Sequence, residues 1–187
     1  MDPLSQDVLE RLVHSSGDLS LAALLQFSPG ACEAGLQALQ QGAVILTDTA
    51  MAAAAVRPMA ARTSGNEVRC LLDWAPAQSP QGSTRSAAAM VRAWPELIQA
   101  ANNAGKPLPL VLIGSAPTAL EQLLDQLDAG AQAPSLVIGM PVGFVGVPES
   151  KRRLAQTTLD QIRLDGTRGG AGLVAAAVNA LLRQVAS

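Results

Sequence analysis

The chain has 187 residues and a single histidine, His14, which is the first candidate for acid–base chemistry. Histidine is the only residue type whose ordinary pKa lies near neutral pH, so it can both donate and accept a proton there. His14 stands late in a segment, 7–15, whose apolar residues recur at helical spacing. A lone histidine is more often a surface or structural residue, so the residues alone leave both interpretations open.

Two arginines stand in similar local sequences that suit carboxylate binding. Arg85 lies within GSTRS at 82–86, and Arg168 lies within GTRGG at 166–170. In each case Thr-Arg follows a glycine and precedes a predicted helix, which places a guanidinium near free backbone N–H groups. Both arginines could equally be solvated surface charges.

Two apolar runs, 110–113 and 136–138, are followed directly by Gly114 and Gly139 and then by predicted helices. Glycine at the end of a strand lets the backbone approach a ligand, and helix N-termini offer N–H groups to anions. Open α/β sheets bind ligands at the carboxyl ends of their strands. The pattern predicts an anion-recognising rim, although tight turns that need small residues explain it equally well.

Several other chemistries are excluded by missing motifs. Gly139, Gly143 and Gly146 have the spacing G-x-x-x-G-x-x-G, which is neither the dinucleotide fingerprint nor a P-loop. No G-x-S-x-G is present. One histidine and two distant cysteines predict no metal site. A net charge of −2 and very few aromatic residues argue against nucleic-acid binding. Acid–base chemistry, or binding without chemistry, remains.

These residues must be positioned by an alternation of strands and helices. Continuous apolar runs typical of strands covered on both faces occur at 43–47, 68–72, 110–113 and 136–138, with a short edge strand at 161–164. Helices are predicted at 7–15, 19–26, 31–41, 51–56, 84–93, 95–102, 118–128, 149–158 and 170–185. The alternation predicts one α/β domain, 1–187, in which helix layers enclose a mostly parallel sheet of about five strands: a three-layer α/β/α sandwich.

The sequence predicts a cytoplasmic protein without membrane segments. The N-terminus lacks the apolar core of a signal peptide. The most apolar late stretch, 171–182, is too short to span a bilayer.

Seven short motifs, in this order, resemble the precorrin-8X methylmutase (precorrin isomerase) family. They run from about residue 12 to the C-terminus, and the ordered set is specific although one motif alone could be chance. The motifs are Val13-His14 with Gly17, Phe27-Ser28-Pro29, Ser64 to Val68, Thr84 to Ala89, Ile113 to Leu120, Gly139 to Gly146 with Glu149-Ser150-Lys151, and Gly169-Gly170.

The resemblance implies a cofactor-free isomerase of cobalamin (corrin) biosynthesis. It would move a methyl group from C11 to C12 of precorrin-8X, or of cobalt-precorrin-8, to give hydrogenobyrinate or cobyrinate. His14 would donate a proton to the ring, and the protein would be a homodimer with active sites near the subunit interface. The substrate-binding residues implied are Asn66, Thr84, Arg85, Ser86, Gly114, Thr118, Met140, Pro141, Val142, Gly143, Phe144, Lys151, Arg168 and Gly169.

Two departures from the family pattern leave an alternative open. Family members generally have a further helical segment before the histidine, whereas this chain begins almost at that helix, which indicates a shortened member. Ser15 and Ser16 replace a common Ala-Cys pair. The alternative is a catalytically weak or inactive paralogue that binds a corrinoid or other tetrapyrrole. An unrelated nucleotide or sugar-phosphate protein is disfavoured because the phosphate motifs are missing.

Overall fold

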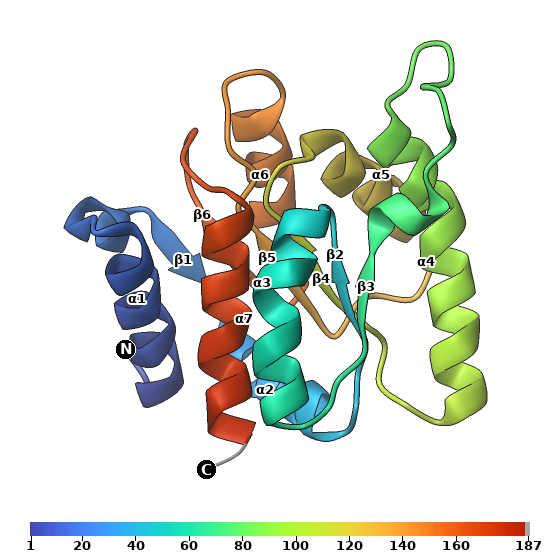
Figure 1. Cartoon of the computed structure of the whole chain (residues 1–187). Coiled ribbons are helices and arrows are strands. Elements are labelled where there is room, and N and C mark those ends of the chain that lie inside the picture. Colours follow the sequence, from blue (N-terminus) through green and yellow to red (C-terminus); the bar gives the residue numbers. More distant parts are fainter. Residues whose placement is uncertain (186–187) are drawn as a thin grey trace.

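The computed structural model describes residues 1–185, in which helices cover both faces of a six-stranded sheet (Figure 1). The strands are β1 (Leu25–Phe27), β2 (Ile45–Thr47), β3 (Val68–Cys70), β4 (Leu110–Ile113), β5 (Leu136–Gly139) and β6 (Gln161–Leu164). The helices are α1 (Pro3–Ser16), α2 (Ala31–Gln40), α3 (Ala50–Arg62), α4 (Arg85–Ala104), α5 (Pro117–Asp128), α6 (Val147–Ala155) and α7 (Ala171–Val185), with short 3-10 turns η1 (Leu19–Ala23) and η2 (Leu71–Trp74).

The strand order is β1-β6-β5-β4-β2-β3, and every neighbouring pair is parallel except β1 with β6. Parallel strands all end at the same edge of a sheet, so the segments that follow β2, β4, β5 and β6 lie together. We call this the carboxyl edge, which is the upper edge of the sheet in Figure 1.

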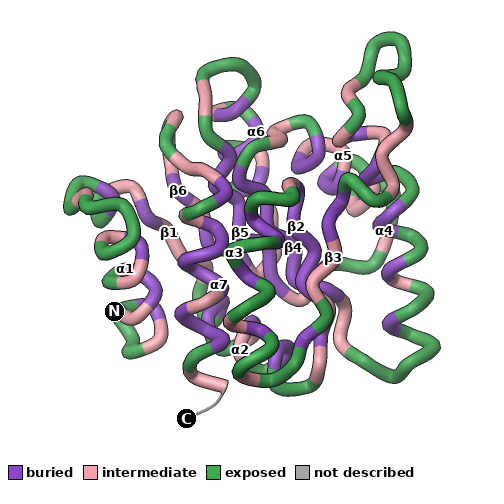
Figure 2. The backbone as a smooth tube through the Cα atoms, viewed as in Figure 1, coloured by how far each residue is buried: buried purple, intermediate pink, exposed green. Residues whose placement is uncertain are grey.

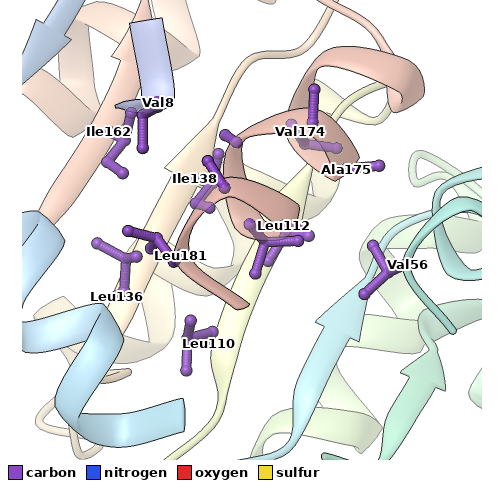
Figure 3. Close-up of a cluster of buried hydrophobic side chains, with 14 of the residues drawn as sticks. Val8, Val56, Leu110, Leu112, Leu136, Ile138, Ile162, Val174, Ala175 and Leu181 are labelled. Atoms are coloured by element: carbon purple, nitrogen blue, oxygen red, sulfur yellow. The ribbon is translucent and has the colours of Figure 1, made fainter. Parts of the chain in front are cut away.

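The sheet is buried on both faces, which explains the continuous apolar runs in the sequence. Along β4, Leu110 and Leu112 join a core with α1, α2, α3 and α7, whereas Val111 and Ile113 join a second core with α4, α5 and α6. Figure 3 shows Leu110 and Leu112 in the first core, together with Leu181 of α7. The predicted three-layer α/β/α sandwich is therefore confirmed.

Burial follows the same layers: the inner strands are largely buried, the edge strands β1 and β3 are partly buried, and the helices expose their outer faces (Figure 2). Helix α7 packs between α1 and α3 on one face of the sheet. Its inner positions are mostly alanine, and small side chains let neighbouring helices approach closely. No helix within residues 1–185 is long and apolar enough to cross a membrane.

The first strand differs from the prediction of a helix at 19–26. The segment forms η1 and then β1, which pairs antiparallel with β6 through Leu25 and Leu164. The sheet therefore has six strands rather than about five, and β6 is an inner strand rather than an edge. Three residues are too few to show strand periodicity, and the partner that stabilises β1 lies far along the chain.

Helix α4 is continuous where the sequence predicted two helices separated at Pro95. Proline lacks an N–H donor and usually ends or kinks a helix. Here Trp94 is fully buried and Leu97 nearly so, both packed in the core against α5 and the sheet. This packing holds the helix together through the proline.

Candidate functional site

An open cavity of about 490 Å³ lies at the carboxyl edge, where the loops after β5 and β6 meet the end of α1. Its volume is within the range of small-molecule sites. We call it the glycine-loop cavity. It is lined by Ser15, Ser16, Leu21, Val142, Gly143, Phe144, Thr167, Arg168, Gly169, Gly170, Gly172 and Leu173.

The end of α1 is fixed beside this cavity by local sequence and by one distant contact. Gly17 adopts φ of 67°, a left-handed conformation that suits glycine and ends the helix. Asp18 then caps η1 by accepting from the backbone N–H of Ser20 at 2.9 Å. Arg168 reaches across from the loop after β6, pairs with Asp18 and donates to the Ser20 hydroxyl. The guanidinium therefore ties one wall of the cavity to the other.

The loop that carries Arg168 is held from beneath by a buried lysine. The Lys151 ammonium donates to the carbonyl oxygens of Gly166 at 2.9 Å and Arg168 at 2.6 Å. Lys151 is 1% exposed, and its burial lowers the pKa of the amine to about 8. Both donors are directed at backbone oxygens, so this lysine shapes the loop instead of facing the cavity.

Close backbone packing joins the loops after β5 and β6. The N–H of Gly170 donates to the carbonyl of Met140 at 2.9 Å, and the N–H of Gly143 donates to Thr167 at 2.9 Å. A Cβ at Gly169 would fall well inside contact distance of the Met140 carbonyl oxygen. Glycine is required at 169 because two backbones meet there.

The backbone N–H groups of the loop after β4 are bound by a carboxyl group of the same chain. Asp48, which follows β2, is 1% exposed, and its Oδ2 accepts from the N–H groups of Gly114 at 3.0 Å, Ser115 at 2.6 Å and Ala116 at 2.8 Å. Burial raises the pKa of Asp48, and these three N–H donors partly offset that rise.

This arrangement changes the interpretation of the rim predicted from the sequence. The backbone N–H groups of the rim predicted at Gly114 are occupied, but by the carboxyl group of the chain's own Asp48. Asp48 directly follows β2 and precedes α3, but it does not cap that helix: the hydroxyl of Thr49 caps α3 by accepting from Ala52 N–H at 3.2 Å.

Five of the predicted binding residues meet at the glycine-loop cavity, and four lie beside or beneath it, including Lys151 described above. Val142, Gly143, Phe144, Arg168 and Gly169 line it. Met140 and Pro141 are buried in the loop that forms its floor. Gly114 lies at the end of β4, where a Cβ would come within 2.8 Å of the Ala171 backbone at the start of α7.

Four other predicted residues gather at a separate place, where α4 and α5 begin. Thr84 and Thr118 line a hollow of about 410 Å³, and their hydroxyl oxygens are 2.7 Å apart. Ser86 is in the first turn of α4. The Nε of Arg85 donates to the carbonyl of Pro76 at 2.8 Å, which directs this guanidinium to the backbone of the preceding loop.

Asn66 lies apart from all the other predicted residues. It precedes β3, so it is at the amino edge of the sheet, opposite the cavity. Its buried amide donates to the carbonyls of Leu39 at 3.0 Å and Ala43 at 2.8 Å. These bonds give Asn66 a structural role, because its donors satisfy buried backbone carbonyls at the end of α2.

His14 is exposed on α1 and does not line the glycine-loop cavity, although the next two residues do. It instead lines a neighbouring groove of about 510 Å³ between α1 and α7. We call this the histidine groove. It is lined by Asp7, Glu10, Arg11, His14, Ala180, Arg183 and Gln184.

Sequence reasoning missed several residues of this region. Leu21, Gly172 and Leu173 line the cavity, and Asp18 and Asp48 support its surroundings. A helical period in 171–185 could have suggested Gly172 and Leu173, but no local signal pairs Asp18 with Arg168. The described part of the chain contains no group of three or more His, Cys, Asp or Glu side chains that could hold a metal ion.

Comparison with known proteins gives a consistent result. The family model for precorrin-8X methylmutase matches residues 1–184. A precorrin-8X methylmutase from Pseudomonas aeruginosa is 43% identical over 176 residues, covering 91% of this chain and 80% of that protein. A cobalt-precorrin-8 methylmutase from Salmonella typhimurium is 36% identical over 183 residues, covering 96% of this chain and 81% of that protein.

A solved structure gives the same result at the level of the fold. The precorrin-8X methylmutase from Thermus thermophilus superposes with a TM-score of 0.82 at 39% identity, covering 100% of this chain and 87% of that one. Sequence and structure therefore agree with the resemblance carried by the motifs, and the chain belongs to the precorrin-8X methylmutase family.

Proposed function

We propose that this chain isomerises precorrin-8X by moving a methyl group from C11 to C12, with the ring bound at the glycine-loop cavity and His14 as proton donor. One observation carries the proposal: the helix that bears the only histidine of the sequence ends on the wall of an open cavity built from the family's glycine motifs. The family match over residues 1–184 supports it further.

The residues of the cavity suit a large, flat and partly apolar ligand. Val142, Phe144 and Leu173 offer apolar contact, and the cavity is open, so a macrocycle can lie across it with its carboxylates toward solvent. Protonation of the ring by His14 makes the conjugated system electron-poor and lowers the barrier to methyl migration. A positioned general acid contributes roughly 10²–10⁴-fold, and holding the ring in a reactive geometry contributes the rest.

A homodimer with sites near its interface forms part of this proposal. His14 does not line the cavity of its own chain, so the imidazole of one copy would serve the cavity of the other. Two large apolar side chains are available for a contact between copies: Phe144 is 85% exposed and Val145 is 90% exposed.

The proposal covers both the metal-free and the cobalt-containing ring. The relatives carry both names, precorrin-8X methylmutase and cobalt-precorrin-8 methylmutase. The carbons that exchange the methyl group lie at the periphery of the macrocycle, so the protein need not contact its centre. We also propose a cytoplasmic location, supported by two unpaired, buried thiols, Cys32 and Cys70.

Conversion of precorrin-8X, followed by its visible spectrum, tests the proposal. Wild-type protein should change the colour, because methyl migration alters the conjugation, and His14→Asn should abolish the change while retaining binding. Binding without conversion by the wild type would instead support the inactive paralogue.

A second variant tests the place of binding. Gly172 is helical, and a Cβ there would meet nothing within 4 Å, so Gly172→Leu should project into the cavity without distorting the fold. We expect it to block conversion, whereas the matched variant Gly172→Ala adds only a methyl group and should remain active. Full activity of Gly172→Leu would place the site elsewhere.

A further inference from the structure

Three cationic side chains among the predicted substrate-binding residues are already bonded to groups of this chain. Lys151 donates to two backbone carbonyls, Arg168 pairs with Asp18, and Arg85 donates to the carbonyl of Pro76. Precorrin-8X carries many carboxylates. A cation that is near the proposed acid and not committed to an internal partner is therefore the better candidate for holding one of them.

Arg11 meets this description. It precedes His14 by three residues on α1, so both side chains lie on the same face of the helix, and both line the histidine groove. The guanidinium of Arg11 makes no hydrogen bond or ion pair with any residue in 1–185, and its Nε is buried. A buried donor without a partner is costly, which is why such groups are uncommon unless something else satisfies them.

The acidic residues of the groove do not satisfy Arg11. The carboxylate of Asp7 accepts from the side-chain amide of Gln184, and that of Glu10 accepts from Gln6 at 2.8 Å. Arg183 lies on the opposite wall, on α7. The groove thus combines two guanidinium groups with the imidazole of His14, while each carboxylate is held by an amide.

We propose that the histidine groove is a carboxylate subsite in which Arg11 binds one acidic side chain of the corrinoid ring. The inference rests on the proposed function and deepens it. Arginine suits this task, because its planar guanidinium donates two parallel hydrogen bonds to a carboxylate. Such a contact would hold the ring edge one helical turn from His14 and so orient the ring toward the proton donor.

Titration with hydrogenobyrinate, the metal-free product, tests the subsite through the absorbance of the ring. Because charge-assisted hydrogen bonds of this kind are strong, we expect Arg11→Met to weaken hydrogenobyrinate binding roughly 10- to 100-fold. The affinity of Arg11→Lys should lie between those of the wild type and Arg11→Met. Arg92→Met provides the matched control, because Arg92 is an exposed arginine on α4, on the other face of the sheet. It should bind as the wild type does.

Thermal unfolding separates binding from folding. Arg11 has no internal partner, so Arg11→Met should leave the melting temperature unchanged or raise it, whereas loss of a structural arginine would lower it. If Arg11→Met bound hydrogenobyrinate as tightly as the wild type, the subsite would be overturned. Conversion of precorrin-8X by the wild type would still support the proposed function in that case. Absence of hydrogenobyrinate binding to the wild type would overturn both.

Discussion

At the scale of single residues, two buried ionisable side chains of this protein shape loops. Lys151 and Asp48 are each 1% exposed, and each bonds only to backbone groups in the interactions described above. Lys151 holds the loop after β6 by its carbonyls, and Asp48 holds the loop after β4 by its N–H groups. The two loops border the carboxyl edge, so these side chains act on the site through backbone geometry.

The lysine predicts a pH dependence of stability with a defined sign. Burial lowers the pKa of Lys151 to about 8 in the folded protein from 10.5. Between these values the unfolded chain binds the proton that the folded chain has lost, so the free energy of unfolding rises with pH. This contribution amounts to roughly 3–4 kcal/mol at most and is complete above the unfolded pKa.

Urea unfolding of the wild type and Lys151→Met across this pH window measures the effect. We expect the stability difference between them to move in favour of the wild type as pH rises. Lys106→Met, at an exposed lysine, serves as the control. A difference that stayed constant, or moved the other way, would mean that Lys151 is not buried as described.

At the scale of elements, α6 is fastened to α5 by one arginine. Arg153 pairs with Glu121 at 2.5 Å, Asp125 at 2.7 Å and Asp128 at 2.7 Å. These carboxylates raise the pKa of the guanidinium. We call these ion pairs of Arg153 the α5–α6 clamp. Helix α6 also carries Lys151, so the clamp fixes the helix that supports the loop after β6.

Removing this clamp should destabilise the fold in a salt-dependent way. Arg153→Met leaves three carboxylates near one another, and we expect a loss of roughly 1–2 kcal/mol at low salt, since the group is only partly buried. Added salt screens the repulsion and should recover part of the loss. Arg152→Met, which removes one exposed ion pair with Glu149, is the control and should cost less. Equal losses in the two variants would contradict the clamp.

At the scale of the whole molecule, the proposed site is distributed over two places on one chain. His14 faces the histidine groove, while the glycine loops enclose the neighbouring cavity. Both adjoin α1, whose end is tied to the cavity wall through Asp18 and Arg168. In the proposed homodimer, a second copy would bring an imidazole to each cavity.

Mixing two inactive variants tests this arrangement. When equal amounts of His14→Asn and Gly172→Leu exchange subunits at random, half of the dimers are heterodimers. If sites are shared, one of the two sites in each heterodimer combines an intact imidazole with an intact cavity. We therefore expect recovery of about a quarter of the wild-type activity if the sites are shared between subunits. Sites built from one chain would give no recovery, and sedimentation equilibrium would report the dimer independently.

Much of this protein could be predicted from its sequence. Continuous apolar runs such as 110–113 and 136–138 indicated a sheet buried on both faces, because only apolar side chains tolerate burial without partners. The ordered motifs identified the family, which the comparisons confirm. The glycine segments at 139–146 and 166–170 contain several residues that line the glycine-loop cavity, where close backbone approach requires residues without a side chain.

The tertiary structure alone decided how the polar residues are used. Arg168, Lys151 and Asp48 each bond to groups that are distant in the chain. The partners of Lys151 and Asp48 are backbone carbonyls and N–H groups, which carry no residue-specific signal in the sequence. The strand β1 likewise depends on pairing with β6, far along the chain. Residue type defines what a charge can bind, but only the packing of the loops determines which partner lies within reach.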